Sequence, residues 1–459
     1  MTPEKAPERV SGGTSAAYLA GAAAAGNAED SRGLSAHAAG EAPRSGDFFW
    51  NSLGGMLNAF QSVFLLMVIT RVCGLAEAGI FSIAFATGNL FMYLGNYGVH
   101  NYQVSDLQEN YSFPDYLWHR FASAALMAAA SAVTVLYSYG TGSYSARKAL
   151  VVAAMCVLKT EDCLEEVFEG RMQQRGRLDE AGKTMTVRLL VSIGGMIAVL
   201  VLTKDLLTAT WAAVVLAYLS AGGMVLHYKE TVGMRRQRLR FRKVMGLMRT
   251  CFPVCVSNFL SFYLINAPKY AIDAAMDEKA QARYNFIAMP VFVTQLLGMF
   301  IYQPLLIRMT VSFRKMERGE EGGRREFRAL FLRVCGAILA VSTVCLAGAY
   351  LIGTPVLGAL YATDLSDLRA ELMIILVGGV FLAFCSFLCA VLTLMRAQKW
   401  IPISYVFGTA LSLFLTPALT GAQGIRGAVV SFMFIMAAVT ILLGICYVRT
   451  VRHTDKRIH

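Results

Sequence analysis

The chain has 459 residues, of which 56% are hydrophobic and 16% charged, and its mean hydropathy is +0.52. Because soluble domains carry about a quarter charged residues, this composition excludes an ordinary soluble globular protein. The net charge of +12 would suit a nucleic-acid-binding protein, but its distribution along the chain, described below, argues against nucleic acid as a partner.

The first 47 residues differ from the rest of the chain. They are rich in Ala, Gly, Ser, Pro and charge, and contain almost no large apolar side chain. Such a segment cannot bury enough apolar surface to fold, so residues 1–47 are predicted to be a disordered cytoplasmic tail. The weakly apolar stretch 16–26 follows two glutamates and has little bulk, so we do not expect a cleaved signal peptide.

Continuous apolar segments follow this tail. A membrane-spanning helix needs about 20 mostly apolar residues, and lipid tolerates only helices and closed barrels. The apolar runs do not alternate with polar residues as barrel strands do, so the sequence predicts an all-α integral membrane protein with about twelve transmembrane helices. The predicted spans are residues 48–70, 79–99, 119–140, 148–169, 184–203, 207–227, 250–270, 284–306, 329–352, 372–394, 400–419 and 425–447.

The basic residues predict the orientation. Twelve spans place both termini on one side, and that side carries most of the Lys and Arg, in segments 171–183, 229–249, 308–328 and after 447. The positive-inside rule then puts both termini in the cytoplasm of a protein of the inner (cytoplasmic) membrane. Attraction of these loops to anionic lipid accounts for the basic surplus without nucleic acid.

The longest basic loop also divides the chain. Residues 229–249 form a predicted cytoplasmic linker between a lobe of six helices at 48–228 and a second such lobe at 250–447, and residues 448–459 form a cytoplasmic tail. Two lobes of equal helix number are typical of transporters built from structural repeats.

The sequence contains no motif for catalysis or cofactor binding. It has no GxxxxGK[ST], HExxH or GxSxG pattern, so we expect neither an enzyme nor a bound cofactor. Most of the ten cysteines lie in apolar stretches, and the two pairs spaced by four residues have no histidine nearby. We therefore interpret them as small apolar side chains and expect no metal site.

Charged residues within the predicted spans are the strongest functional signal, because such residues are costly in lipid unless they face a cavity or a partner. Six of them lie in the second half of the fourth span: Lys159, Glu161, Asp162, Glu165, Glu166 and Glu169. Spacings of three and four residues place four of these side chains on one stripe of a helix, which the other two widen. The stripe either lines a substrate or proton path, or belongs to a solvated cytoplasmic helix that begins near Leu158.

Two more cations lie in other spans. Arg188 lies about one turn inside the fifth span on the cytoplasmic side, where it would either pair with Glu165, Glu166 or Glu169 or bind an anionic head group. Lys269 follows Pro268 in the seventh span, and Asp273 follows four residues later. Lys269 either binds substrate or extends toward the interface and pairs with Asp273.

Uncharged polar residues occur in the first span. Asn51, Asn58 and Gln61 interrupt its apolar sequence, and the two asparagines are two helical turns apart. They would either serve a sugar path or form hydrogen bonds between helices.

Three segments resemble one family. Residues 69–91, ITRVCGLAEAGIFSIAFATGNLF, contain an RxxG…AGxFS…A pattern carried by Arg71, Gly74, Ala78, Gly79, Phe81 and Ser82. This pattern resembles the opening of Wzx-like polysaccharide flippases in the multidrug/oligosaccharidyl-lipid/polysaccharide (MOP) exporter superfamily. The segments YGVHNYQVSD, at 97–106, and VFEGRMQQRGRLDEAGK, at 167–183, look like parts of one branch of the same family.

The resemblance implies two six-helix lobes around a central cavity that opens alternately to each side of the membrane. It further implies that the chain flips an undecaprenyl-diphosphate-linked oligosaccharide for surface polysaccharide synthesis, with glycan polymerase or glycosyltransferase as expected partners. From the intramembrane charges we assign the cations for the diphosphate to Lys159, Arg188 and Lys269. Arg71 and the three amides of the first span complete the predicted substrate-binding set. The six carboxylates named above, Asp273 included, are predicted to couple transport to an ion or to form salt bridges.

Two alternatives remain open from the sequence. A cation-coupled multidrug antiporter of the same superfamily would use the carboxylates to bind cations. An integral-membrane glycan polymerase or ligase is the other, but such proteins typically carry a large extracytoplasmic loop, and all the outside loops predicted here are short.

Overall fold

The computed structural model describes residues 45–106, 109–233 and 240–458. The predicted N-terminal tail lies outside these residues as far as position 44, and its last three residues belong to the first helix. Every regular element in the described ranges is helical, so the predicted all-α class is confirmed.

Each of the twelve predicted spans corresponds to one long helix of the described chain. The first six are α2 (Ser45–Cys73), α3 (Leu75–Asn96), α5 (Phe113–Gly140), α6 (Ala146–Gln174), α7 (Leu178–Thr203) and α8 (Leu206–His227). The second six are α10 (Phe241–Ala275), α11 (Glu278–Glu317), α12 (Gly323–Gly348), α14 (Arg369–Leu394), α15 (Trp400–Gln423) and α16 (Ile425–Ile458). Short elements join them: α4 (Val99–Ser105), α9 (Lys229–Val232), η2 (Ala349–Gly353), α13 (Thr354–Tyr361) and η3 (Ser366–Leu368).

The protein is a multi-pass membrane protein by the length and hydropathy of these helices. Eleven of them are long and apolar enough to cross a bilayer. The twelfth long helix is α6, whose second half carries the charged stripe and is therefore too polar to qualify on composition. Its polar side chains are buried against neighbouring helices instead of facing lipid, as described below.

Local sequence sets where the helices begin and end. Gly74 adopts φ 89°, which a residue with a side chain rarely does, and the chain reverses there between α2 and α3. Ser145 caps α6 by accepting a hydrogen bond from the backbone of Lys148, and Asp277 caps α11 through Ala280. These caps fix the ends of the two helices that meet at the contact between the lobes.

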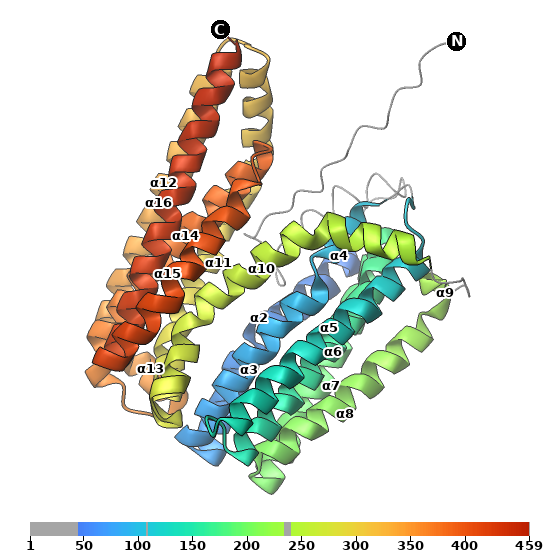
Figure 1. Cartoon of the computed structure of the whole chain (residues 1–459), viewed down its shortest axis with the longest axis vertical. Coiled ribbons are helices and arrows are strands. Elements are labelled where there is room, and N and C mark those ends of the chain that lie inside the picture. The colour runs from blue at the N-terminus through green and yellow to red at the C-terminus, as the bar shows by residue number, and fades with distance from the viewer. Residues whose placement is uncertain (1–44, 107–108, 234–239, 459) are drawn as a thin grey trace.

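The helices form two lobes, α2–α8 and α11–α16, that diverge toward one end of the molecule (Figure 1). We call this the basic end, because α9, the first turns of α10 and the last turns of α16 lie there. The lobes approach one another at the other end, near α13, which we call the distal end.

Helix α10 belongs to both lobes. Its first half contributes Leu247, Cys251 and Cys255 to an apolar cluster with Val99 and Tyr116 of the N-terminal lobe, and its second half packs against α15 in the C-terminal lobe. Pro253 and Pro268 interrupt its backbone hydrogen bonds. The segment predicted as a linker at 229–249 therefore contains α9 and the first residues of α10.

Candidate functional site: a cavity between the lobes

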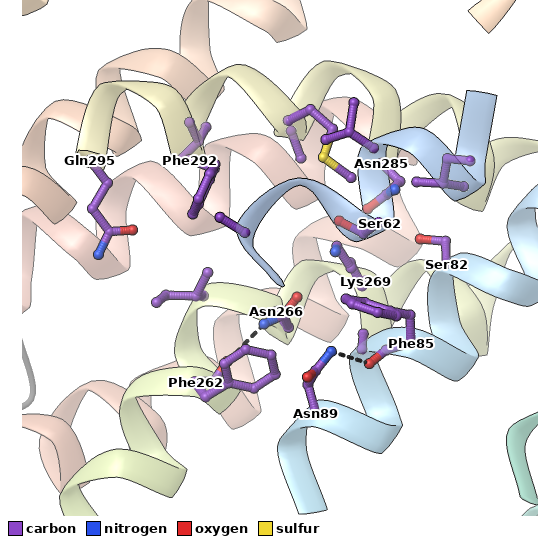
Figure 2. Close-up of a pocket in the computed structure, with 18 of the residues that line it drawn as sticks. Ser62, Ser82, Phe85, Asn89, Phe262, Asn266, Lys269, Asn285, Phe292 and Gln295 are labelled. Carbon is purple, nitrogen blue, oxygen red and sulfur yellow. Dashed lines mark hydrogen bonds between the residues drawn. The ribbon is translucent and has the colours of Figure 1, made fainter. Parts of the chain in front are cut away.

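A cavity of about 240 Å³ lies between the lobes. Helices α2 and α3 supply one wall, and α10, α11, α14 and α16 supply the other, as Figure 2 shows in part. Because its two walls come from different lobes, any relative movement of the lobes changes the shape and the access of this cavity.

The lining combines one cation with amides and aromatic rings. Among the described residues that line the cavity, Lys269 is the one charged side chain, and no carboxylate is present. The amides are Asn58, Gln61, Asn89, Asn266, Asn285 and Gln295, and the rings include Phe81, Phe85, Tyr93, Phe262, Tyr284 and Phe292. A site with this lining can bind an anion, hydrogen-bond to polar groups and stack on flat apolar faces.

Lys269 points into the cavity from α10, one residue after the helix-interrupting Pro268 (Figure 2). The ion pairs of the described residues include none with Lys269, because the carboxylate four residues along, Asp273, is bound to Lys148. A lysine at this depth without a carboxylate partner needs water or an anion to solvate its charge. The cavity therefore contains an unneutralised cation.

The amides leave acceptor and donor groups available. Asn89 Nδ2 donates to the carbonyl of Phe85 at 2.8 Å, and Asn266 Nδ2 donates to that of Phe262 at 3.1 Å (Figure 2). Asn285 Oδ1 is buried and has no hydrogen-bond partner among the described residues. An unpaired buried acceptor is costly, and a hydroxyl-bearing ligand would satisfy it.

The charged stripe of α6 forms a separate cluster within the N-terminal lobe. Lys159 Nζ lies 2.7 Å from Asp162 Oδ2, and Arg188 of α7 forms ion pairs with Asp162, Glu165 and Glu161. Lys159 and Glu161 are each 2% exposed, which is too little for a solvated cytoplasmic helix. The stripe contacts α3, α5 and α7 within the N-terminal lobe, and none of its residues is among those that line the cavity.

The cluster holds more negative than positive charge. Its carboxylates are Glu161, Asp162, Glu165, Glu166 and Glu169, and its cations are Lys159, Arg188 and Arg120, the last of which contacts Glu166 at 2.6 Å. Five carboxylates against three cations leave two in excess. Both oxygens of Glu161 and of Glu165 are buried without a hydrogen-bond partner among the described residues, so these carboxylates are costly to keep ionised.

The structure brings only part of the predicted substrate-binding set to the cavity. Asn58, Gln61 and Lys269 line it, and Gln61 Nε2 donates to Asn58 Oδ1 at 2.7 Å. Asn51 packs on the backbone of α7 at Gly182, and Arg71 lies at the distal end. With Lys159 and Arg188 in the buried cluster, the roles assigned to these four residues stay predictions.

Three lining amides were not singled out from the sequence: Asn89, Asn266 and Asn285. Each is an isolated amide in an apolar span, which is the signal that identified Asn58 and Gln61. The sequence does not reveal which face of each helix points at the other lobe, and that orientation decides whether an amide lines the cavity.

Comparisons with known proteins place the fold. No family model and no curated protein matches the sequence. Among solved structures, the lipid II flippase MurJ in an inward closed conformation superposes with a TM-score of 0.65 at 11% identity, over 88% of this chain and 90% of that one. A multidrug resistance MATE family transporter of the MOP superfamily superposes in its inward-facing conformation with a TM-score of 0.57 at 15% identity, over 86% of this chain and 96% of that one. An outward-facing MATE structure gives 0.55 at 12% identity, over 96% and 99%. The chain therefore has the two-lobed helical fold found in MATE transporters and in MurJ.

Proposed function

We propose that this chain is a transporter that flips an undecaprenyl-diphosphate-linked oligosaccharide across the cytoplasmic membrane by alternating access. Its termini and basic loops would face the cytoplasm, where anionic lipid attracts them. Enzymes that build or polymerise the same glycan would be its functional partners.

The observation that carries this proposal is the lining of the central cavity. Lys269 offers one unneutralised positive charge, six amides offer donors and acceptors, and aromatic rings offer flat apolar faces. A diphosphate requires the first of these groups, and sugars are bound by the other two. The volume of about 240 Å³ would hold the diphosphate or one sugar, with the rest of the cargo toward the basic end.

The same lining argues against a multidrug antiporter that carries cations. A cationic drug in this cavity would meet Lys269 and no carboxylate among the described lining residues. Like charges at close range in a low-dielectric site repel strongly. An anionic cargo is favoured over a cationic one for this reason.

The excess carboxylates of the N-terminal lobe would supply ion coupling. Two of the five must be neutralised, and the neighbouring Arg188 and Lys159 would repel a metal cation. No group of His, Cys, Asp and Glu in the described part of the chain has the geometry of a metal site. Glu161 has no hydrogen-bond partner there for either oxygen, and of the three carboxylates that pair with Arg188 it lies farthest from the arginine, at 3.4 Å. A proton on Glu161 is therefore the coupling ion we propose.

The experiment that tests the cargo is a flipping assay in proteoliposomes with a fluorescent undecaprenyl-diphosphate oligosaccharide. Lys269→Met is expected to abolish flipping, and Lys269→Arg to retain part of it, because the arginine keeps the positive charge. Lys279→Met is the matched control, since Lys279 is an exposed lysine on the neighbouring helix α11. Equal flipping by the wild type and Lys269→Met would overturn the proposal.

Two further measurements separate the alternatives. Deletion of the gene is expected to remove a surface polysaccharide and to leave drug tolerance unchanged, whereas a multidrug antiporter would give the reverse. For coupling, Glu161→Gln is expected to flip cargo at a rate independent of the transmembrane pH gradient. A gradient dependence equal to that of the wild type would exclude Glu161 as the proton carrier.

A further inference from the structure

A buried ion pair joins the two lobes at the distal end. Lys148 Nζ of α6 lies 2.6 Å from Asp273 Oδ1 of α10 and 3.6 Å from Glu278 Oε1 of α11. The side chains of Lys148 and Asp273 are only 5% and 9% exposed. Since one partner belongs to each lobe, this contact can exist only while the distal end is closed.

The surroundings of the pair are also made by both lobes. Gly79 of α3 packs so closely on α11 that a Cβ atom there would lie 1.8 Å from the carbonyl oxygen of Glu278. Tyr270 of α10 donates its hydroxyl to the carbonyl of Ala86 at 3.2 Å. Closure of the distal end therefore excludes water from the Lys148–Asp273 pair and strengthens it.

Asp273 has a second lysine within reach on its own helix. Lys269 precedes it by four residues, and side chains at this spacing are neighbours on a helix. Lys269 points into the cavity and has no carboxylate partner in the described structure, because Lys148 holds Asp273. Asp273 pairs with Lys148 in this structure, its spacing of four residues also places Lys269 within reach, and it neutralises one of the two lysines at a time.

We propose that Asp273 changes partner during transport: it binds Lys148 while the distal end is closed, and Lys269 once the lobes part there. This inference rests on the proposed function, in which Lys269 holds the anionic group of the cargo. When the distal end opens, Asp273 loses Lys148, pairs with Lys269 and displaces the diphosphate toward the distal side. When the end closes, Lys148 withdraws Asp273 and restores the anion site.

Linkage gives the exchange a quantitative form. If Asp273 competes with the cargo for Lys269, then anion binding and distal closure must favour one another by the same factor. The affinity for the anion is therefore higher in the distal-closed state, by about tenfold at typical coupling energies. This difference favours release at the distal end, and the proton of the proposed function would supply the free energy for net transport.

The first measurement reports only on the contact between the lobes at the distal end, which we call the distal gate, and it needs no cargo. Spin labels on cysteines at Ser143 and Ser366, which are exposed in distal turns of different lobes, would be placed in a background without native cysteines. Pulsed electron paramagnetic resonance then measures the distance between the lobes. Lys148→Met and Asp273→Asn are expected to shift the distribution to longer distances, and the double variant K148D/D273K to restore the short one.

Arg147→Met is the matched control for this measurement. Arg147 precedes Lys148 on α6, but its partners Glu77 and Asp205, at 2.9 and 2.7 Å, belong to its own lobe. Loss of this cation is expected to leave the distance distribution unchanged. Unchanged distances in Lys148→Met and Asp273→Asn as well would overturn the claim that the Lys148–Asp273 pair keeps the distal end closed.

The second measurement tests the exchange, with sugar-free undecaprenyl diphosphate as the probe for binding and the fluorescent cargo for flipping. Lys148→Met is expected to bind the probe about tenfold more weakly, and K148D/D273K to close the gate yet fail to flip, because no carboxylate remains to release Lys269. Normal flipping by K148D/D273K would overturn the exchange. Wild-type probe binding by Lys269→Met would instead overturn the proposed function, whatever the distances show.

Discussion

The ring of Phe85 separates Lys159 from the central cavity. Lys159 Nζ lies 4.9 Å from the centre of this ring, and Phe85 is itself a cavity-lining residue. Lys159 is bound to Asp162 on the far side of the ring. The buried charge cluster and the cation of the cavity are therefore neighbours that share a wall.

This separation predicts different reactivities for two cysteines. In a background without native cysteines, Ser62→Cys, a cavity-lining position that leaves Lys269 in place, is expected to react with a membrane-impermeant thiol reagent applied from the basic end, and added lipid-linked glycan is expected to protect it. Lys159→Cys is expected to stay unreactive, because position 159 is 2% exposed. Adding Phe85→Ala should make Lys159→Cys reactive. Rapid labelling of Lys159→Cys with Phe85 intact would contradict this arrangement.

Arg188 is predicted to be essential to the stability of the N-terminal lobe. Arg188→Met would leave Asp162 and Glu165 buried without their arginine, and breaking a buried ion pair in this way costs about 3–5 kcal/mol. Thermal unfolding in detergent measures the loss. Lys183→Met is the matched control on α7, because Lys183 is 34% exposed in its pair with Asp179 and should cost under about 1 kcal/mol. Equal losses would mean that the cluster is not dry.

Gly79 is predicted to be required for distal closure. The Cβ of Gly79→Ala would collide with the backbone carbonyl of Glu278, which cannot move aside as a flexible side chain could. The distal labels at 143 and 366 should therefore report a longer distance. Gly194→Ala is the control, because no atom lies within 4 Å of its added Cβ, and it should stabilise α7 by about 0.5–1 kcal/mol. A closed distal end in Gly79→Ala would refute the prediction.

Asp205 caps α8 in a distal turn outside the spans. Hydrogen bonds from Thr208, followed by the nearby Arg147, lower the pKa of Asp205 to about 2. A lowered pKa contributes stability above the ordinary carboxyl pKa of about 4, and this contribution disappears as the pH falls through about 2. Asp205→Ala should therefore cost about 1 kcal/mol at pH 7, with a difference from wild type that shrinks below pH 4. A difference unchanged down to pH 2 would exclude ionised Asp205 as the cause.

The sequence was sufficient for the helices and insufficient for the site. Each long apolar run produced one long helix, because span length is dictated by bilayer thickness. Even α6 was recognised, although its charges remove it from the helices that qualify on composition. Hydropathy is a local property of the sequence, and helices form from hydrogen bonds between residues close in the sequence, so hydropathy was enough to locate them.

Ion pairs within the spans could be predicted only between helices that are joined by a short connection. The short connection between α6 and α7 predicted the pairing of Arg188 with Glu165, which the structure contains. Glu166 was considered for the same arginine, but it binds Arg120 of α5. Asp273 was considered as one possible partner of Lys269, and in the structure it binds Lys148 across the lobe contact. Ion pairs between helices that are distant in the sequence depend on how those helices pack against one another, and no local sequence pattern determines that packing.

Helix α10 has a mechanical consequence for any transport cycle. Its first half is anchored in the apolar cluster of the N-terminal lobe, and its second half packs in the other lobe. A continuous rod fixed at both ends prevents the lobes from sliding past one another and leaves bending as the main permitted motion. Pro253 and Pro268 mark the places where the rod bends most easily. Since Lys269 and Asp273 follow Pro268, bending α10 at this proline would change the direction of both charged side chains in a single movement.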